Sequence, residues 1–399
     1  MAAVRSPFRG RAPSTRADLA SSPALARPCY PRAVSDLPAT MRAVVLHEHG
    51  GPEVLNYAEV PTPQPGPGQV VVRTYAVALN RLDIFVRGGL PGLKLEYPHR
   101  LGSDIAGVVA AVGAGVAPSE IGREVVLNPG FGCGRCEHCL DGWDNLCARY
   151  HILGESTQGG YGEYVLAPVE NLVDKPARLG WIEAAAFPLT FLTAWQMLTV
   201  RAKVGPGDIV LIHAAGSGVG SAAVQIAKLH GATVVALASS EAKLLQAREL
   251  GADHTVSSAD PQWSKAVRAL PGVGRRGVDI VFEHVGRSTW DASLKICRKG
   301  GTVVTCGASS GWEATTDLRH VFFRQLQVLG STMGSRTHLP KLARLIEAGD
   351  LDPVVDRVFE LEAAADAHRY LDQRQQFGKV VLRVHPDAHE AEAHGRAGG

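Results

Sequence analysis

The second half of the chain alternates apolar β-type runs with helical patterns, and this alternation restricts the fold more than any other feature. Short runs rich in Val, Ile and Leu predict buried strands at residues 208–213, 233–237, 278–282, 301–306 and 327–330. Helical patterns separate them, and the first two lie at 218–230 and 240–250. Because apolar strands that alternate with helices are buried on both faces, we predict a doubly wound parallel sheet covered by helices.

The first half has the pattern of a β-rich domain. Short β-branched runs lie between Gly- and Pro-rich turns, at 70–74, 105–112 and 124–127. We therefore predict an α/β fold in which a β-rich domain over 41–187 precedes the parallel-sheet domain over 188–330. Residues 331–386 hold one predicted helix (339–348) and one predicted strand (379–383), too little for a third domain, so we expect them to return to the first.

The two ends of the chain have the composition of disordered segments, and the charge and hydropathy argue against a nucleic-acid-binding or membrane-spanning protein. Residues 1–40 contain six arginines and two acids and are expected to be disordered, as is the tail 387–399. The leader is either an organelle transit peptide or lies upstream of a true start at Met41, which we favour, with a cytoplasmic location. A net charge of +2 does not indicate a nucleic-acid-binding surface. The sequence has no run of about 18 apolar residues that would indicate a membrane span.

A glycine-rich turn follows the first strand of the parallel-sheet domain and leads directly into a helix. It reads His-Ala-Ala-Gly-Ser-Gly-Val-Gly over residues 213–220. Small residues let the backbone approach a diphosphate, and a helix N-terminus offers free N–H groups to it. A strict G-x-G-x-x-G is absent, but the position between strand and helix predicts a dinucleotide site. The expected diphosphate contacts are Gly216, Ser217, Gly218, Val219 and Gly220.

The end of the second predicted strand indicates which nicotinamide cofactor binds. An NAD site places an acid there to hold the ribose 2′-hydroxyl, whereas this chain has Ala238 followed by Ser239, Ser240 and Lys243. Two hydroxyls and an ammonium suit a 2′-phosphate, so we predict NADPH. The alternative is that Ser240 only caps the following helix and that Lys243 is a solvated surface charge.

Four of the seven cysteines lie within 15 residues, with the spacing C-x2-C-x2-C-x7-C. They are Cys133, Cys136, Cys139 and Cys147. Four thiolates at this spacing predict one closed, structural zinc site per chain, without the open position that a catalytic zinc keeps. An iron–sulfur cluster is the competing interpretation, although its usual run has three residues before the last cysteine and a proline after it.

Together these features resemble the medium-chain dehydrogenase/reductase superfamily over about residues 41–385. The cysteine spacing and the glycine turn carry the resemblance, and Leu-Gly-Ser-Asp-Ile-Ala-Gly at 101–107 and Phe-Leu-Thr-Ala-Trp at 191–195 support it. The resemblance implies a GroES-like first domain, a Rossmann second domain and a homodimer or homotetramer. It also implies hydride transfer between a nicotinamide and a small-molecule substrate in the cleft between the domains.

The chain departs from the zinc alcohol dehydrogenases at the positions that match their catalytic zinc ligands. Asn80, Ser103 and Leu189 stand where the resemblance expects Cys, His and Cys. These groups cannot hold zinc tightly. A metal kept through Asp83 and Asp104, with His151 or His284, is the alternative.

Asn80 and Asp83 instead resemble the active-site pair of the zinc-free quinone reductases, although Asp83 and Arg87 could simply pair on one helix. The resemblance further implies that particular residues lie near the nicotinamide or ribose: Thr193, His284, Val285, Cys306 and Gly307. His284 could equally be an ordinary loop histidine. We expect the Asn80 amide to donate a hydrogen bond to a substrate oxygen, whereas the sequence singles out no proton donor among Tyr75, Tyr161 and His284.

The expected function is therefore an NADPH-dependent reductase of an activated C=C bond or a quinone. Two rival functions remain open. One is an alcohol or aldehyde dehydrogenase with unusual zinc ligands, and the other is an NADP-binding scaffold protein without turnover.

Overall fold

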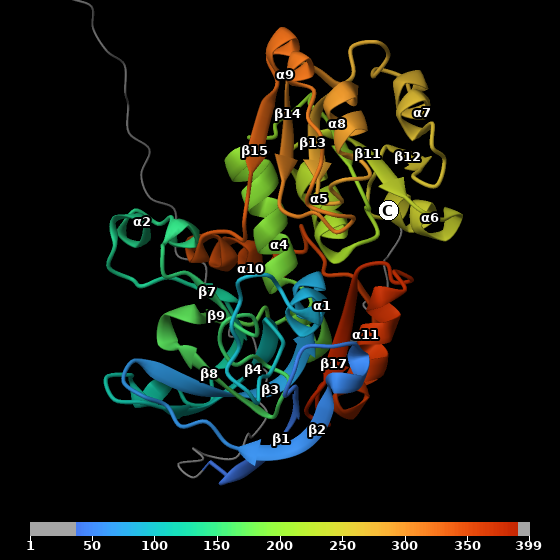
Figure 1. Ribbon diagram of the computed structural model, residues 1–399. Helices are drawn as coiled ribbons and strands as arrows, with labels where there is room; N and C mark the ends of the chain where they lie inside the picture. Colours follow the sequence, from blue (N-terminus) through green and yellow to red (C-terminus); the bar gives the residue numbers. More distant parts are fainter. Residues whose placement is uncertain (1–36, 390–399) are drawn as a thin grey trace, which may run out of the picture. The chain divides into compact units, whose positions relative to one another are not determined.

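The structure is a computed structural model that describes residues 37–389 (Figure 1). Most of the predicted leader and tail lies outside these residues. The described chain enters its first strand at Thr40. At the other end it remains packed to His389, whose carbonyl accepts a 3.0 Å hydrogen bond from the Trp181 N–H beside the buried Ala388.

The first half of the described chain and its C-terminal segment, 355–383, together form a mainly antiparallel sheet in the order β16-β17-β3-β4-β5-β9, with β8 also paired to β3. Its strands are β3 (Gln69–Ala78), β4 (Asp104–Val112), β5 (Glu124–Leu127), β8 (Tyr164–Pro168), β9 (Leu172–Asp174), β16 (Val355–Glu360) and β17 (Lys379–Arg383). Two small ribbons accompany it: β1 (Thr40–Val45) with β2 (Asn56–Pro61), and β6 (Gly130–Phe131) with β7 (His151–Ile152). Helices α1 (Arg81–Gly88), α2 (Glu137–Leu140), α3 (Trp181–Ala185) and α11 (Ala364–Asp372) belong to the same part of the chain.

The C-terminal strand β17 pairs with β3, far away in the sequence. The pairing is antiparallel, with Val381 opposite Ala78 and Leu382 opposite Val77. Two residues further along this register, Lys379 comes to lie opposite Asn80, just beyond the end of β3. The last strand thus delivers a lysine to one of the predicted catalytic residues.

The second sheet is parallel, in the order β12-β11-β10-β13-β14-β15. Its strands are β10 (Ile209–Ile212), β11 (Thr233–Ala238), β12 (His254–Ser257), β13 (Val278–Glu283), β14 (Cys297–Thr305) and β15 (Gln327–Gly330). The accompanying helices are α4 (Pro188–Trp195), α5 (Gly218–Leu229), α6 (Glu241–Glu249), α7 (Trp263–Ala269), α8 (Trp290–Ile296), α9 (Leu318–Arg324) and α10 (Leu339–Glu347). This strand order is that of a doubly wound dinucleotide-binding sheet, which confirms the predicted fold class.

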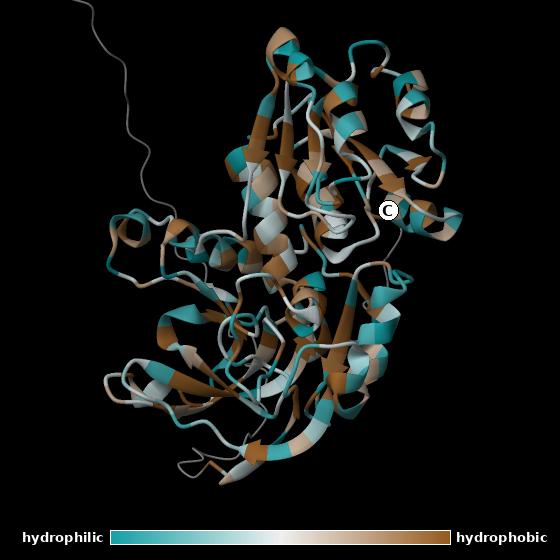
Figure 2. Cartoon of the chain, viewed as in Figure 1, coloured by the Kyte–Doolittle hydropathy of each residue, from teal (hydrophilic) through white to brown (hydrophobic). Residues whose placement is uncertain are grey.

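Apolar side chains pack both sheets into continuous cores, and Figure 2 shows the strands of the parallel sheet as mostly hydrophobic. One cluster joins Ile212 of β10 and Phe191 of α4 to Ala76 and Ala106 of the first sheet. Helix α4 therefore packs against both sheets. Within residues 37–389, no helix is long and apolar enough to cross a bilayer.

Candidate active site

The glycine turn has the geometry of a diphosphate site. Ser217 caps α5, and its Oγ accepts a 3.0 Å hydrogen bond from the Gly220 N–H. A Cβ on Gly220 would lie 2.4 Å from the Ala214 carbonyl oxygen, so only glycine fits there. The first N–H groups of α5, on Gly218 and Val219, have no carbonyl partner within the helix and can bind an anion. The turn therefore fits the cofactor predicted from the sequence.

The segment before β17 closes over this turn. Gly378 donates a 2.9 Å hydrogen bond from its N–H to the Gly216 carbonyl. A Cβ on Gly216 would lie 3.0 Å from the Phe377 ring. Glycine at this position therefore lets the segment before β17 pack closely against the turn. The predicted contact residues 216–220 thus form a turn beyond the carboxyl end of β10, an interior strand of the parallel sheet.

The predicted 2′-phosphate residues follow β11, and their contacts are mixed. Ser239 is exposed, whereas the Oγ of Ser240 caps α6 by accepting from the Lys243 N–H at 3.4 Å. The capping role considered for Ser240 is therefore present. Lys243 is not a freely solvated charge, because its Nζ donates a 2.6 Å hydrogen bond to the Arg374 carbonyl and burial lowers its pKa.

Arg374 is a cation that the sequence did not single out. It lies next to Lys243, and its guanidinium donates to the Ser309 carbonyl at 3.3 Å. The sequence offers no signal for it, because the bonds that place it span 131 and 65 residues. The Lys243 side chain lies close to Gly216, whereas the Arg374 guanidinium lies at the loop that follows β14.

The residues predicted to face the nicotinamide lie at the ends of the central strands and on α4. The Thr193 hydroxyl oxygen is buried, with no hydrogen-bond partner among the described residues, as expected of a group that meets a cofactor. His284 contacts the His213 carbonyl through Nε2 at 2.8 Å, and burial lowers its pKa. It is therefore a neutral loop histidine whose N–H is already used. Cys306 lies beside it after β14, and burial raises its pKa to about 12, so its thiol stays protonated.

A buried carboxylate, Glu283, holds the loop that contains His284 and Val285. It accepts hydrogen bonds from the N–H groups of Val285 (2.7 Å) and Gly286 (3.1 Å) and from the Ser293 hydroxyl (2.6 Å). Sequence reasoning missed Glu283, which reads as the last residue of a strand. Gly307 follows on the neighbouring strand end, where the Thr305 hydroxyl donates to its carbonyl at 3.2 Å.

Asn80 and Asp83 meet at the N-terminus of α1. Asp83 accepts from the Asn80 N–H at 2.6 Å and from the Gly102 N–H at 2.9 Å, so it ties the helix start to the loop before β4. Arg87 does not pair with Asp83. It bonds instead to His368 at 2.9 Å and Asp372 at 3.2 Å, which removes the simple ion-pair interpretation.

The buried ammonium of Lys379 joins Asn80, at one of the positions that match catalytic zinc ligands, to Asp104. Lys379 Nζ donates to Asn80 Oδ1 at 2.7 Å and to Asp104 Oδ2 at 2.8 Å, and Asn80 Nδ2 donates to the same Asp104 oxygen at 3.0 Å. Asp104 also accepts a 2.6 Å bond from the Leu189 N–H. The Ser103 hydroxyl points away, to the Leu153 carbonyl at 2.7 Å. The matching positions thus hold an amide (Asn80), an apolar side chain (Leu189) and a hydroxyl that already donates to a carbonyl (Ser103). These groups do not fit a catalytic zinc.

Two of the suggested proton donors are committed elsewhere. The fully buried Tyr161 hydroxyl contacts His368 Nε2 at 2.9 Å. Because Arg87 can only donate to His368 Nδ1, the neutral imidazole carries its proton on Nε2 and donates to Tyr161. Burial lowers the pKa of His368 to about 3, which keeps it neutral. Tyr75 is stacked between Trp181 and His385, with ring centroids 4.3 and 4.5 Å apart.

The buried carboxyl of Asp83 predicts how the stability of the protein depends on pH. Burial raises the pKa of its carboxyl from 3.8 to about 6, against the opposing effect of its two N–H bonds. Between pH 6 and 4 the folded state takes up this proton and the unfolded state does not, so the contribution of Asp83 to stability becomes more favourable as pH falls. We expect the unfolding free energy of wild type minus that of Asp83→Asn to increase by up to about 3 kcal/mol from pH 7.5 to pH 4.

Urea unfolding at both pH values measures this difference. Glu313→Gln is the matched control, because its carboxylate is 81% exposed and should show a difference that hardly changes with pH. A difference that stays constant for Asp83→Asn as well would contradict the assignment of a raised pKa.

The four predicted zinc ligands converge in one lobe between β6 and β7. The Sγ atoms of Cys133, Cys136, Cys139 and Cys147 all lie within 4.8 Å of one another. The distance between Cys136 Sγ and Cys139 Sγ is 3.6 Å, close to the ~3.8 Å expected between sulfurs of a tetrahedral site with Zn–S of ~2.3 Å. In the part of the chain that the structure describes, this is the only group of three or more such side chains that could hold a metal.

The lobe also contacts the end of the parallel-sheet region. Asn145 donates to the Thr332 carbonyl at 3.1 Å, and Asp144 accepts from the Arg336 N–H at 3.1 Å. Order in the lobe is therefore linked to the segment between β15 and α10.

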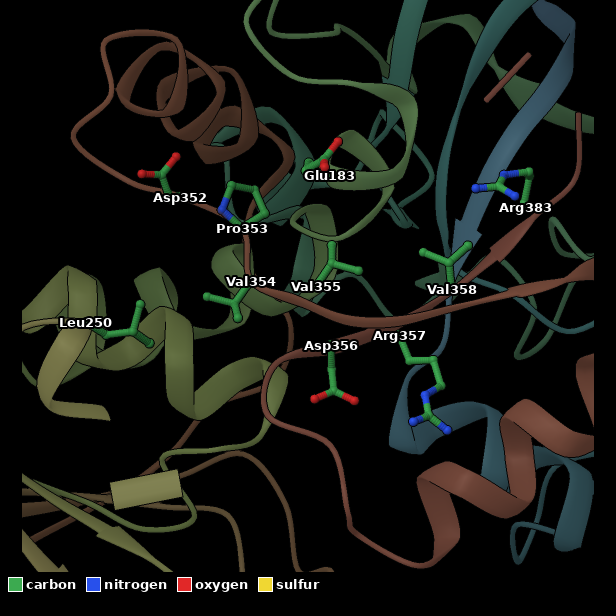
Figure 3. A pocket seen from close by; sticks show the side chains of 10 residues that line it. All are labelled: Glu183, Leu250, Asp352, Pro353, Val354, Val355, Asp356, Arg357, Val358 and Arg383. Carbon is green, nitrogen blue, oxygen red and sulfur yellow. The ribbon is translucent and has the colours of Figure 1, made fainter. Parts of the chain in front are cut away.

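A pocket of about 690 Å³ lies along β16 (Figure 3), and the carbonyl of its lining residue Val354 accepts a 2.9 Å hydrogen bond from the Lys379 N–H. Val354, Val355 and Val358 line it together with acidic and basic side chains. None of the site residues predicted from the sequence belongs to its lining.

Known proteins match the chain over most of its length. Family profiles match residues 66–177 (Alcohol dehydrogenase GroES-like domain) and 218–348 (Zinc-binding dehydrogenase). A 2-haloacrylate reductase from Burkholderia sp. is 33% identical, over 85% of this chain and 98% of its own length.

Two solved structures are similar as well. A crystal structure titled NAD-dependent alcohol dehydrogenase is 54% identical, with a TM-score of 0.83, over 86% of this chain and all of the other. The crotonyl-CoA carboxylase/reductase AntE in complex with NADP is 28% identical, with a TM-score of 0.82, over 90% and 97% of the two chains. The chain therefore belongs to the medium-chain dehydrogenase/reductase superfamily, and it is an oxidoreductase.

Proposed function

We propose that this protein reduces an activated C=C bond or a quinone with NADPH, and that it does so without a catalytic zinc. The observation that carries the proposal is the hydrogen-bonded group of Asn80, Asp104 and Lys379, in which Asn80 stands at a position that matches a zinc ligand. Relatives with reductase names, 2-haloacrylate reductase and crotonyl-CoA carboxylase/reductase, support this class of reaction.

The absence of zinc ligands favours reduction over alcohol oxidation. An alcohol must lose its proton as hydride leaves, and a metal makes that step easy at neutral pH. An enone, enoyl thioester or quinone needs no such step, because charge develops on an oxygen that hydrogen-bond donors can stabilise. NADPH, when bound, supplies the hydride, and the chain supplies the donors.

Asn80 is oriented to act as one of these donors. Its Oδ1 accepts from Lys379, which fixes the amide so that Nδ2 faces Asp104. One N–H of Nδ2 is used by Asp104, whereas the other has only a long 3.5 Å contact to the Ala78 carbonyl. That second N–H is available to a substrate oxygen.

Asn80→Ala is expected to lower turnover by at least about tenfold, because one oriented donor is lost. The measurement is steady-state NADPH oxidation, with thermal unfolding followed in parallel to show that the variant is folded. Asn80→Asp is the matched control, since it keeps the size of the side chain but has no N–H to donate. Unchanged turnover in both variants would reject the role of Asn80.

NAD-dependent alcohol oxidation is the second candidate, favoured by the relative of 54% identity that carries this name. One experiment separates the candidates: cofactor consumption with a panel of quinones, enones, enoyl thioesters and alcohols, with metal analysis of the same sample. The proposal predicts one zinc per chain and activity in the reductive direction. Two zincs and alcohol oxidation would support the alternative, and no turnover with any substrate would support a scaffold role.

We also propose a homodimer or homotetramer in the cytoplasm. Support for self-association comes from exposed apolar side chains near the outer strand of the parallel sheet, with Phe322 59%, Phe323 71% and Val328 42% exposed. The cytoplasmic location stays a prediction from the sequence.

A further inference from the structure

Lys379 is a buried lysine of the candidate active site, and its amino group lies between two hydrogen-bond acceptors. Its side chain is 4% exposed, and its partner Asp104 is fully buried. The contacts to Asp104 (2.8 Å) and Asn80 (2.7 Å) provide an anion and a neutral oxygen, which are the partners that a buried ammonium requires. The cluster therefore places the amino group of Lys379 beside Asn80, which stands where the resemblance to zinc alcohol dehydrogenases expects a metal ligand.

One N–H of this ammonium remains for a ligand. An ammonium has three N–H groups, and the described residues provide two acceptors for them. The stem of Lys379 also lies against the diphosphate turn, since a Cβ on Gly218 would be 2.7 Å from Lys379 Cδ. Lys379 thus contacts both the predicted cofactor turn and Asn80.

We propose that Lys379 acts as the electrophilic catalyst of this enzyme: its free N–H donates a hydrogen bond to the substrate oxygen on which negative charge develops. The proposal rests on the proposed function and defines its substrate class as a conjugated carbonyl or quinone. Hydride, with its two electrons, adds to the β-carbon of an enone or enoyl thioester; the π pair of the C=C bond shifts to join the α-carbon and the carbonyl carbon, and the π pair of the C=O bond moves onto the carbonyl oxygen. Lys379 keeps its proton and stabilises this enolate, after which water protonates the α-carbon.

A second role for Lys379 must be distinguished, namely binding the cofactor diphosphate. Lys379→Met removes the charge and keeps the length of the side chain. If Lys379 is the electrophile, the turnover of Lys379→Met falls by at least about 100-fold while the Kd for NADPH, measured by fluorescence titration, changes less than about twofold. If Lys379 serves the diphosphate, the Kd for NADPH rises and single-turnover hydride transfer at saturating cofactor stays normal, which would overturn the proposal.

Folding is controlled with a second variant. Lys379→Met leaves Asp104 buried and unpaired, which is destabilising. The double variant Lys379→Met/Asp104→Asn removes both charges together and should fold while showing the same loss of turnover. Full activity in the folded double variant would contradict the role of Lys379.

A binding readout separates this inference from the proposed function. 4-Nitrophenolate mimics the oxyanion and reports its surroundings by its absorption spectrum. In the presence of NADP⁺, wild type should bind it at least about tenfold more tightly than the double variant does. Equal binding would overturn the assignment of Lys379 even if reduction is observed. Tighter binding by wild type without turnover of any enone or quinone would retain Lys379 and overturn the proposed function.

Discussion

Replacing Cys147 with serine is expected to abolish zinc binding and to lower the midpoint of thermal unfolding by at least about 10 °C. We infer one structural zinc per chain, because four thiols converge within 4.8 Å. The free energy of metal binding at such a site is also folding free energy, so its loss destabilises the lobe. The lobe contacts the segment after β15 through Asn145 and Asp144, so disorder should spread to that segment. Zinc content by mass spectrometry and calorimetry measure the two effects.

Cys297→Ser is the matched control for this experiment. Cys297 is a buried thiol outside the lobe, so its variant should keep one zinc per chain and lose only packing. Unaltered zinc content in Cys147→Ser would contradict the assignment. Visible absorbance with iron in place of zinc would instead support the cluster that the sequence left open.

The fold followed from the sequence wherever long apolar runs dominate local structure. The predicted strand 379–383 and the strand 124–127 have the bounds that the structure gives to β17 and β5, and the helix at 218–230 matches α5 to within one residue. β12, at His254–Ser257, was missed because it is a four-residue edge strand with only one buried side chain. Short edge strands form because a neighbour offers hydrogen bonds, a condition that local patterns do not contain.

The candidate site was harder to predict, because its polar contacts depend on strand pairing. The sequence identified Asn80 and Asp83, and their roles stay predictions. It did not identify Lys379, which looks like the first residue of an ordinary strand and meets Asn80 only through the register of β17 on β3. Arg374 was missed for the same reason, since its guanidinium contacts a carbonyl 65 residues away. Glu283 has nearby partners, Val285, Gly286 and Ser293, and was missed because a single acid at a strand end does not reveal that it is buried.

Ser239→Asp is expected to lower kcat/KM with NADPH by at least about 100-fold and to leave kcat/KM with NADH unchanged or higher. The predicted 2′-phosphate would face a carboxylate at the end of β11, and juxtaposed like charges cost several kcal/mol. The same carboxylate can accept a hydrogen bond from the 2′-hydroxyl of NADH. Ser239 is exposed, so the substitution should not disturb the core.

Lys243→Ala tests the cationic side of the same site. Its loss should lower kcat/KM with NADPH by about tenfold, because one charge-assisted contact disappears. Lys243 also bonds the Arg374 carbonyl, so kcat/KM with NADH serves as the internal control for any loosening of this segment. Lys265→Ala, which removes an exposed lysine on α7, is the surface control. Equal efficiency of the wild-type enzyme with the two cofactors would reject NADPH specificity and, with it, a phosphate-binding role for Ser239 and Lys243.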